Sequence, residues 1–303
     1  MPSVGSLFSG VGGFDLGFEQ AGFEVAWQVE IDRDAVSVLE RHWPDVPRYG
    51  DIATVDPAEL APVDVVIFGS PCQDFSVAGK RAGLDGARSG LFGEAIRIIR
   101  GLRPAPALVC WENVPGTLSS AGGRDFGAVL DALAGAGALD IAWRILDARW
   151  FGVPQRRRRL FVVSDLRAER AAEVLFEPQG SSGHPAESRA ARQGAARDAA
   201  DGAGVATFDE RNVTSRANRT RVEYGAPANT LHADGLSVIT PMAVRRLTPT
   251  ECCRLMGWSD DWVTYRADGS EIPDGPRYRM IGNGVVAPVA RWIAERMLAV
   301  LEA

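Results

Sequence analysis

The sequence predicts an α/β fold in which helices cover a mainly parallel sheet. Residues 4–8 are a short strand-like stretch that precedes a glycine-rich turn and a helical pattern of apolar residues. Two further apolar runs, residues 63–68 and 107–111, are bounded by turn residues, as is typical of buried parallel strands. Strands that alternate with helices form a doubly wound sheet, which binds ligands beyond the carboxyl ends of its strands.

Length and composition allow one large or two smaller domains. The chain has 303 residues, and 46% of them are hydrophobic, which is enough for a sizeable core. The formal net charge of −6 does not indicate that the protein binds nucleic acid, although a basic binding face can exist locally. The four cysteines show no zinc-binding spacing, so no metal site is predicted. Because the sequence shows no signal peptide and no membrane-spanning run, we expect a cytoplasmic protein with reduced thiols.

The remaining elements follow from apolar periodicity. Residues 25–29, 143–149 and 160–163 are strand-like. Apolar residues at helical spacing predict helices over residues 14–21, 91–102, 126–135 and 285–301.

The first strand, turn and helix are typical of a nucleotide-binding site. The glycines of residues 9–13 would let the backbone approach a ligand, although a plain tight turn explains them equally well. Glu30 ends the next strand 20 residues after Gly10, the spacing at which an acid binds a ribose diol. Asp51 follows another strand-to-loop corner and could accept from an adenine amino group. A solvated strand end and a turn are the alternatives for these two acids.

A cysteine and a glutamate follow the two central apolar runs. Cys72 comes after Pro71, whose φ is nearly fixed, at the expected ligand-binding edge. A thiol in this place is a candidate nucleophile, whereas an isolated cysteine is more often buried and structural. Glu112 ends the next strand, so a thiol and a proton-holding carboxylate would meet at one edge, a pair that suits addition to a heterocycle. The alternative for Glu112 is a helix cap.

Two basic segments accompany these residues. The glycine-punctuated residues 77–90 are interpreted as a loop that closes over a substrate, or as an ordinary solvated loop, and they carry Lys80, Arg81 and Arg88. Strand alternation over residues 155–159 places Gln155, Arg157 and Arg159 on one face and turns Arg156 and Arg158 outward. Adjacent arginines are typical of a solvated basic edge or a phosphate clamp, whereas inward arginines orient a carboxylate or a polar base edge.

These motifs occur in the order of a known family. The matching segments are Phe8-Ser9-Gly10-Val11-Gly12-Gly13, Glu30, Asp51-Ile52, Pro71-Cys72-Gln73, Glu112-Asn113-Val114, Gln155-x-Arg157-x-Arg159, Arg246-Leu247-Thr248-Pro249-Thr250-Glu251-Cys252 and Gly282-Asn283-Gly284-Val285-Val286. This order resembles the C5-cytosine-specific DNA methyltransferase family of prokaryotic or phage type. The resemblance spans about residues 4–164 and resumes from about residue 245 to the end. Ser6 departs from it where many members have Asp, and Gly284 departs where Ser is usual.

The resemblance implies a Rossmann-like S-adenosylmethionine-dependent methyltransferase domain with a smaller target-recognition domain. Residues 1–165 and 275–303 would form the first domain, and the last helix would pack back onto the N-terminal sheet. Residues 166–274 would form the second domain. Within it, residues 180–204 lack Val, Ile, Leu, Met and aromatic residues, so we expect a flexible insertion.

The resemblance also implies roles for individual residues. Cys72 would add to C6 of a flipped-out cytosine, and Glu112 would bond N3 and the exocyclic amine, supported by Arg157 and Arg159. S-adenosylmethionine would lie across Phe8, Gly10, Gly12, Gly13, Glu30, Asp51, Ile52, Pro71, Asn283 and Val285. Double-stranded DNA would contact Gln73, Ser76, Lys80, Arg81, Arg88, Arg211, Arg216, Arg219, Arg221 and Thr230, although any one recognition-region residue could instead be solvated or touch only phosphate.

Three other functions fit parts of the sequence. A tRNA cytosine-C5 methyltransferase shares these catalytic motifs, but such proteins usually carry a Cys-Phe-Thr element that this sequence lacks. A catalytically silent DNA-binding relative is disfavoured by the intact catalytic residues, and a nicotinamide-dependent dehydrogenase explains only the glycine turn. The motifs do not give the target sequence. They also do not separate an enzyme paired with a cognate restriction endonuclease from an orphan or phage-protective one. We expect a monomer that acts in the cytoplasm of a prokaryotic cell, encoded by that cell or by a phage.

Overall fold

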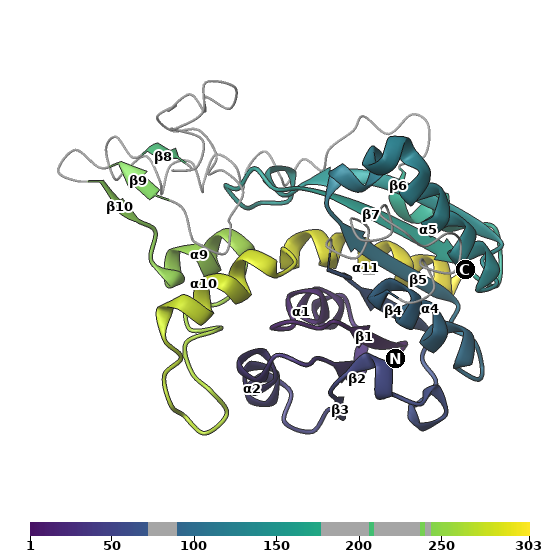
Figure 1. The fold of residues 1–303 in the computed structure, drawn as a ribbon, viewed down its shortest axis with the longest axis horizontal. Helices are drawn as coiled ribbons and strands as arrows, with labels where there is room; N and C mark the ends of the chain where they lie inside the picture. The colour runs from purple at the N-terminus through teal and green to yellow at the C-terminus, as the bar shows by residue number, and fades with distance from the viewer. Residues whose placement is uncertain (72–89, 177–205, 209–236, 240–243) are drawn as a thin grey trace.

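A seven-stranded sheet forms the centre of the protein (Figure 1). The computed structural model describes residues 1–71, 90–176, 206–208, 237–239 and 244–303. The strand order is β3-β2-β1-β4-β5-β7-β6. Their bounds are β1 (Ser3–Leu7), β2 (Glu24–Val29), β3 (Arg48–Tyr49), β4 (Val65–Phe68), β5 (Leu108–Asn113), β6 (Asp140–Asp147) and β7 (Arg158–Asp165). β7 runs antiparallel to both neighbours, and the other pairings are parallel. The expected α/β fold is therefore confirmed.

Helices cover both faces of this sheet, which is why its central strands are apolar without alternation. Along β4, Val65 and Ile67 join the core under one helical layer, whereas Val66 and Phe68 join the core under the other. The first layer includes α1 (Gly13–Gln20), α6 (Ala171–Leu175) and α11 (Ala287–Glu302). The second layer includes α4 (Leu91–Gly101) and α5 (Arg124–Gly135).

The C-terminal helix returns to the first one, as expected. A Cβ on Gly17 of α1 would lie 2.4 Å from the Cβ of Ala290 and 2.8 Å from the carbonyl oxygen of Ala287. Only a glycine allows the two helices to approach so closely. This contact brings the segment before α11 beside the glycine turn that precedes α1 (Figure 1).

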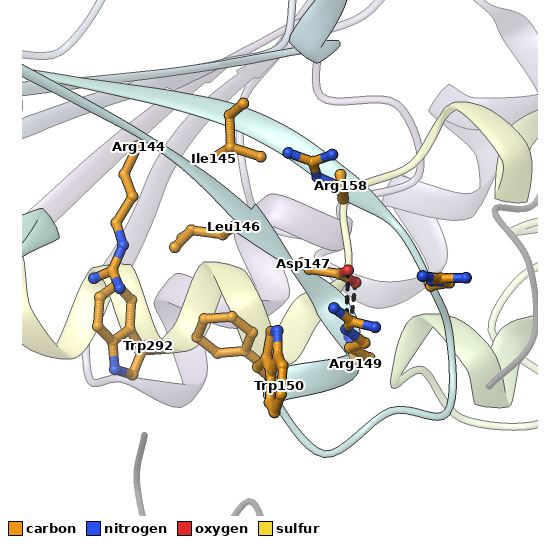
Figure 2. A pocket seen from close by; sticks show the side chains of 10 residues that line it. Arg144, Ile145, Leu146, Asp147, Arg149, Trp150, Arg158 and Trp292 are labelled. Atoms are coloured by element: carbon orange, nitrogen blue, oxygen red, sulfur yellow. Dashed lines mark hydrogen bonds and ion pairs between the residues drawn. The ribbon is translucent and has the colours of Figure 1, made fainter. Parts of the chain in front are cut away.

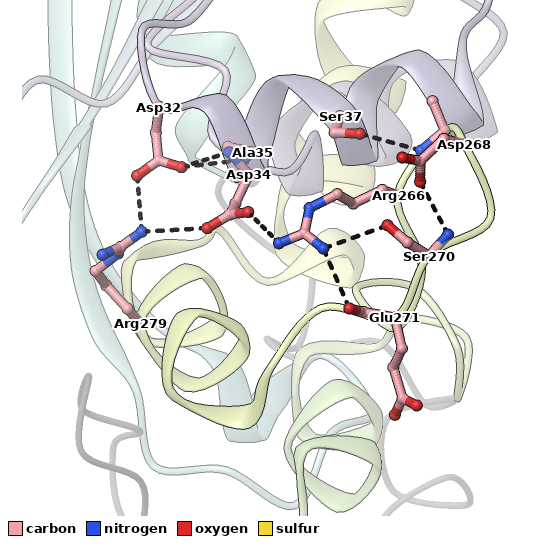
Figure 3. Close-up of polar contacts among 10 residues, drawn as sticks. Asp32, Asp34, Ala35, Ser37, Arg266, Asp268, Ser270, Glu271 and Arg279 are labelled. Atoms are coloured by element: carbon pink, nitrogen blue, oxygen red, sulfur yellow. Dashed lines mark hydrogen bonds and ion pairs between the residues drawn. The ribbon is translucent and has the colours of Figure 1, made fainter.

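A polar network ties α2 (Arg33–His42) and the preceding Asp32 to residues 266–279, as Figure 3 shows. Arg266 Nη2 lies 2.8 Å from Asp34 Oδ1, and Arg279 Nη2 lies 2.9 Å from Asp32 Oδ2. Asp32 also caps α2 by accepting from two backbone N–H groups. The network therefore connects α10 (Asp274–Asn283) and the residues before it to the N-terminal part of the chain.

Residues 247–272 share the core of the large sheet. Trp262 donates from Nε1 to the Val11 carbonyl oxygen at 2.9 Å, and its ring stacks on His42 with centroids 3.6 Å apart. Leu247, the buried face of α9 (Pro249–Met256) and Ile272 belong to the same apolar cluster as α1. The domain division stays a prediction, but this packing argues for a boundary near residue 246 rather than at 274/275.

A small antiparallel sheet, in the order β10-β9-β8, precedes α9. Its strands are β8 (Ala206–Phe208), β9 (Ser237–Ile239) and β10 (Val244–Arg246). The expected flexible insertion, residues 180–204, lies outside the described residues. Across the part of the chain that the structure describes, no helix has both the length and the apolar character needed to cross a membrane.

Candidate active site

One pocket of about 670 Å³ opens at the carboxyl ends of β1, β2, β4 and β5, within the size range of small-molecule sites. It brings together most of the described residues that the sequence assigned to a cofactor and to catalysis. The cofactor set contributes Phe8, Gly10, Glu30, Asp51, Ile52, Pro71 and Asn283, and the catalytic set contributes Glu112, Arg157 and Arg159. Two sets predicted from separate motifs therefore line one continuous space.

The glycine turn presents open backbone to this pocket at Gly10. Gly10 has φ +56°, and no heavy atom lies within 4 Å of the position of a Cβ. Gly12, Gly13 and Val285 do not line the pocket. A Cβ on Gly12 would lie 2.3 Å from the Trp43 ring, and one on Gly13 would lie 2.4 Å from the Val285 carbonyl oxygen. Packing therefore explains these two glycines directly.

The two predicted cofactor acids are held by backbone groups. Glu30 Oε2 accepts from Gly10 N at 2.7 Å, and Oε1 accepts from the N–H groups of Ile31 and Asp32. Burial raises the pKa of Glu30, and these three backbone donors oppose the shift. Asp51 accepts from Ala53 N at 3.0 Å and so caps the short helix η1 (Ile52–Thr54). Both carboxylates are thereby fixed at the pocket wall.

Glu112 is nearly buried at the end of β5, and its negative charge has a partner. Arg159 Nε lies 3.0 Å from Glu112 Oε1, and the side chains of Arg159 and Glu112 are 18% and 12% exposed, respectively. Burial raises the pKa of Glu112, whereas Arg159 and Arg157 lower it. A Cβ on Gly69 would lie 3.2 Å from Glu112 Oε2, so the glycine leaves that oxygen its space.

The arginine alternation predicted from the sequence is present. Gln155 and Arg157 are buried and Arg159 is largely so, whereas Arg156 and Arg158 are exposed. Arg157 Nη2 donates to the carbonyl oxygens of Gly282 and Gly284 at 3.0 and 2.8 Å. Burial lowers the pKa of Arg157 to about 9, and nearby Arg159 contributes to the same shift. Arg157 therefore fixes the C-terminal motif, a role that the sequence did not suggest.

Asn113 and Ser70 hold the backbone that leads to Cys72, and the sequence reasoning missed both. Asn113 Nδ2 donates to the Ser70 carbonyl oxygen at 3.2 Å, while Trp111 Nε1 donates to Ser70 Oγ at 3.1 Å. Asn113 Oδ1 in turn accepts from Val114 N at 2.8 Å. A signal existed: an asparagine directly after a strand-ending glutamate has both a donor and an acceptor to offer neighbouring turns.

The first departure from the family pattern is explained by a buried acid. Ser6 Oγ donates to Asp15 Oδ2 at 3.0 Å, and Gln28 Nε2 donates to Asp15 Oδ1 at 2.9 Å. Burial raises the pKa of Asp15 to about 6. An aspartate at position 6 would put a second carboxylate beside this buried one, so serine suits this chain.

The second departure is explained by a tryptophan. A Cβ on Gly284 would lie 2.4 Å from the Trp258 ring, and a Cβ on Gly13 would lie 2.7 Å from the same ring. Trp258 thus fills the space between the start of α1 and the C-terminal motif. A serine at position 284 does not fit beside it.

Gly284→Ser is therefore expected to lower the free energy of unfolding by about 1–3 kcal/mol, as overpacking of a core does. Denaturant unfolding measures this change. Gly127→Ser is the matched control, because no heavy atom lies within 4 Å of that Cβ position. Adding Trp258→Leu to Gly284→Ser should cost less than the sum of the two single changes. If Gly284→Ser and Gly127→Ser lower the free energy of unfolding by the same amount, the steric explanation is contradicted.

Several predicted residues lie outside the described part of the chain. They are Cys72, Gln73, Ser76, Lys80, Arg81, Arg88, Arg211, Arg216, Arg219, Arg221 and Thr230. Their assigned roles stay predictions.

Known proteins resemble this chain along nearly its whole length. A family model described as C-5 cytosine-specific DNA methylase matches residues 3–201 and 205–299. The type II methyltransferase M.Bsp6I of Bacillus sp. (strain RFL6) is 31% identical over 98% of this chain and 98% of its own length. M2.BsuMI of Bacillus subtilis (strain 168), also a type II methyltransferase, is 31% identical over 97% of this chain and 75% of its own length.

The name of a third relative gives adenine, not cytosine, as the methylated base. It is named DNA N-6-adenine-methyltransferase, comes from Escherichia phage P1 and is 28% identical over 97% of this chain. The chain spans 60% of that relative's length.

Two solved structures share the fold. The Dnmt2 methyltransferase of S. pombe has a TM-score of 0.72 and 17% identity, and an E. coli prophage protein described as a putative DNA modification methyltransferase has a TM-score of 0.69 and 21% identity. Both comparisons cover 100% of each chain. Since the family model matches nearly the whole sequence, the chain belongs to the C-5 cytosine-specific DNA methylase family and is a DNA cytosine methyltransferase.

Proposed function

We propose that this enzyme transfers a methyl group from S-adenosylmethionine to C5 of cytosine within a specific double-stranded DNA sequence, by addition of Cys72 to C6 of a flipped-out base. The observation that carries the proposal is the shared pocket. Glu112 and its partner Arg159 line the same space as Glu30, Asp51 and Phe8. A base held at Glu112 would thus lie beside a ligand held on the other residues.

The residues of the pocket fit S-adenosylmethionine. Glu30 offers acceptor oxygens for ribose hydroxyls, and Asp51 offers one for the adenine amino group. Phe8, Ile52 and Leu91 provide apolar walls for the adenine. The backbone at Gly10 is open to the ligand, and Asn283 is exposed at the rim. The cofactor supplies a methyl group on a positively charged sulfur, which is a good electrophile.

Cys72 and Glu112 would activate the base together. The thiolate of Cys72 forms a bond from its sulfur to C6 while Glu112 holds a proton at N3, so the electron pair of the C5–C6 double bond becomes available at C5. C5 would then bond to the methyl carbon as the bond between that carbon and the cofactor's sulfur breaks, and the sulfur would keep the electron pair and leave as a neutral thioether. Loss of the proton from C5 to a base and breakage of the S–C6 bond restore aromaticity and free the thiolate.

The position of Pro71 supports this role for Cys72. Pro71 lines the pocket, and the next Cα lies about 3.8 Å further along the chain. A cytosine stacked in a duplex cannot present C6 to a thiol, so the target base must leave the stack. We infer that residues 73–90 close behind it and that Gln73 and Ser76 approach the vacated space.

The partners and the cellular location of the enzyme are proposed from its relatives rather than from individual residues. The relatives quoted above come from bacteria and a phage, and two are type II methyltransferases. This supports a prokaryotic or phage enzyme that meets double-stranded DNA in the cytoplasm. It is also consistent with a cognate endonuclease that acts separately. One pocket carries both residue sets, so a monomer would suffice.

A methylation map tests the proposal. The purified protein is incubated with S-adenosylmethionine and unmethylated genomic DNA, and 5-methylcytosine and N6-methyladenine are then located by sequencing. We expect 5-methylcytosine confined to one short motif. Methyl transfer to adenine would instead match the name of the phage relative, and transfer only to tRNA, in a parallel incubation with tRNA, would assign the enzyme to tRNA. Either result, or no transfer to any of them, would contradict the proposal.

A further inference from the structure

A second pocket, of about 350 Å³, lies between the β6–β7 hairpin and α11, and arginines dominate its lining (Figure 2). Arg149 and Arg158 lie beside Asp147 at one end of the pocket, and Arg144 and Trp292 lie at the other. The complete lining is Arg144, Ile145, Leu146, Asp147, Arg149, Trp150, Phe151, Arg156, Arg158 and Trp292. Four arginines and one aspartate give this lining a formal charge of +3, in a chain whose net charge is −6.

Some of these cations have structural partners in the protein. Arg144 Nη1 donates to the Leu175 carbonyl oxygen at 2.7 Å. Arg149 Nε lies 3.1 Å from Asp147 Oδ2, and its guanidinium lies over the Trp150 ring at 4.9 Å from the centroid. Asp147 is therefore neutralised by Arg149 and does not offset the charge of the other arginines.

Arg156 and Arg158 are the cations of this lining that face solvent most openly. Both are exposed, and Arg158 forms no ion pair with any residue that the structure describes. Four like charges gather around one space, and the pairing of Asp147 with Arg149 leaves in place the repulsion between Arg158 and the neighbouring arginines. A bound anion would relieve it. Guanidinium groups that converge on one concave site suit a phosphate, which they bind through paired N–H donors.

The position of the pocket indicates which phosphate. β7 runs antiparallel to β5, so its first residues lie at the edge of the sheet where β5 ends in Glu112. Because side chains alternate along residues 155–159, Arg157 and Arg159 turn to the active site while Arg156 and Arg158 turn to this pocket. Adjacent Cα atoms are about 3.8 Å apart, so the two sites are joined by a short segment of fixed length.

A DNA strand carries phosphates at a regular spacing that suits two sites held at a fixed separation. It places one phosphate about every 3.4 Å along the duplex axis, so phosphates a few nucleotides from a base held at Glu112 come within reach of the hairpin. A free nucleotide would need no such fixed separation from the active site.

We propose that Arg156 and Arg158, in the pocket that Arg149 and Trp150 also line, bind a backbone phosphate of the DNA substrate outside the flipped nucleotide. This inference rests on the proposed function. It gives the outward arginines of the Gln-x-Arg-x-Arg motif a role in holding the duplex, separate from the role of Arg159 beside Glu112.

The salt dependence of DNA binding tests this site. The affinity of the full chain for a duplex that contains its target motif is measured by fluorescence anisotropy from low to moderate salt. Each phosphate contact contributes about 0.9 to the slope of log affinity against log salt concentration. The double variant Arg156→Gln/Arg158→Gln should flatten this slope by about 1–2. Arg103→Gln, which changes an exposed arginine that precedes β5 at the opposite end of the strand from Glu112, should leave it unchanged.

Calorimetric binding of S-adenosylmethionine and the melting temperature confirm that each variant folds. An unchanged slope in the double variant would overturn the site, even if the wild-type protein methylates DNA. The proposal would also be overturned if the double variant changed the slope for binding of tRNA but not for binding of duplex DNA, because the pocket would then bind an RNA phosphate. Failure of the proposed function is distinct, because it shows as absent 5-methylcytosine with the wild-type protein, whatever the slope.

Discussion

Cys72→Ala is expected to abolish methyl transfer while binding of DNA and S-adenosylmethionine survives. Without the thiolate, C5 of cytosine stays too weak a nucleophile to accept the methyl group. Loss of a covalent nucleophile lowers kcat by about 10⁴-fold or more in other enzymes, and the same scale is expected here. Methyl transfer to a duplex substrate measures the change, and anisotropy measures the binding that remains.

The other cysteines give the control. Burial raises the pKa of Cys252 to about 12 and that of Cys253 to about 11, and the buried thiol of Cys110 also has a raised pKa. None of the three is a thiolate at neutral pH, so none is an activated nucleophile. Cys252→Ala should therefore retain transfer.

A substrate with fluorine at C5 makes the result sharper. Fluorine cannot leave as a proton does, so the adduct between Cys72 and C6 should persist and resist denaturation in the wild-type protein and in Cys252→Ala. Cys72→Ala should form no such adduct. Retained turnover in Cys72→Ala, or an adduct mapped to another residue, would exclude Cys72 as the nucleophile.

Glu112→Gln is expected to lower kcat by about 10²–10⁴-fold, the usual contribution of a positioned proton donor. The amide that this substitution introduces can still donate a hydrogen bond but cannot release a proton to N3. Glu94→Gln is the matched control, since it also removes a carboxylate paired with an arginine, Arg97 Nε at 2.6 Å, but outside the pocket. It should leave kcat close to that of the wild-type enzyme.

The pH profile separates a proton donor from a structural group. Burial raises the pKa of Glu112, so the protonated form that donates to N3 persists at higher pH than for a free carboxyl group. Activity that depends on this form is present below the raised pKa and is lost as the pH rises through it. Arg159 lowers the pKa of Glu112, so Arg159→Gln should move this falling limb to higher pH. Glu112→Gln should lack the limb.

These profiles are measured as kcat/KM with saturating S-adenosylmethionine. A falling limb that persists in Glu112→Gln, or that moves to lower pH in Arg159→Gln, would contradict the assignment.

Much of the fold and part of the site follow from local sequence. The apolar runs that precede Cys72 and end in Glu112 were predicted as neighbouring buried strands, and β4 and β5 pair in parallel from Val65 and Leu108 onward. Strand alternation also separated Arg157 and Arg159 from Arg156 and Arg158. Such patterns are readable because side-chain direction depends on the period of one element alone.

The roles of several motif residues were not readable, because their partners lie far along the chain. Arg157 bonds to carbonyl oxygens 125 and 127 residues away, and Gly12 is required by the ring of Trp43. The packing of residues 247–272 into the large core also depends on contacts such as Trp262 with Val11, 251 residues apart. The periodic pattern of one helix or strand carries no information about contacts with residues so far away in the sequence.

The sequence by itself determined the family and the buried parallel strands that lead to Pro71 and Glu112, and it predicts that Cys72 and Glu112 act as a pair. The tertiary structure decided which glycines serve the ligand and which serve packing, and why Ser6 and Gly284 replace the usual residues. It also decided that the outward arginines line one pocket with Trp150. The physical reason is that residue type and spacing fix what a side chain can do, whereas close packing between distant segments fixes what it touches.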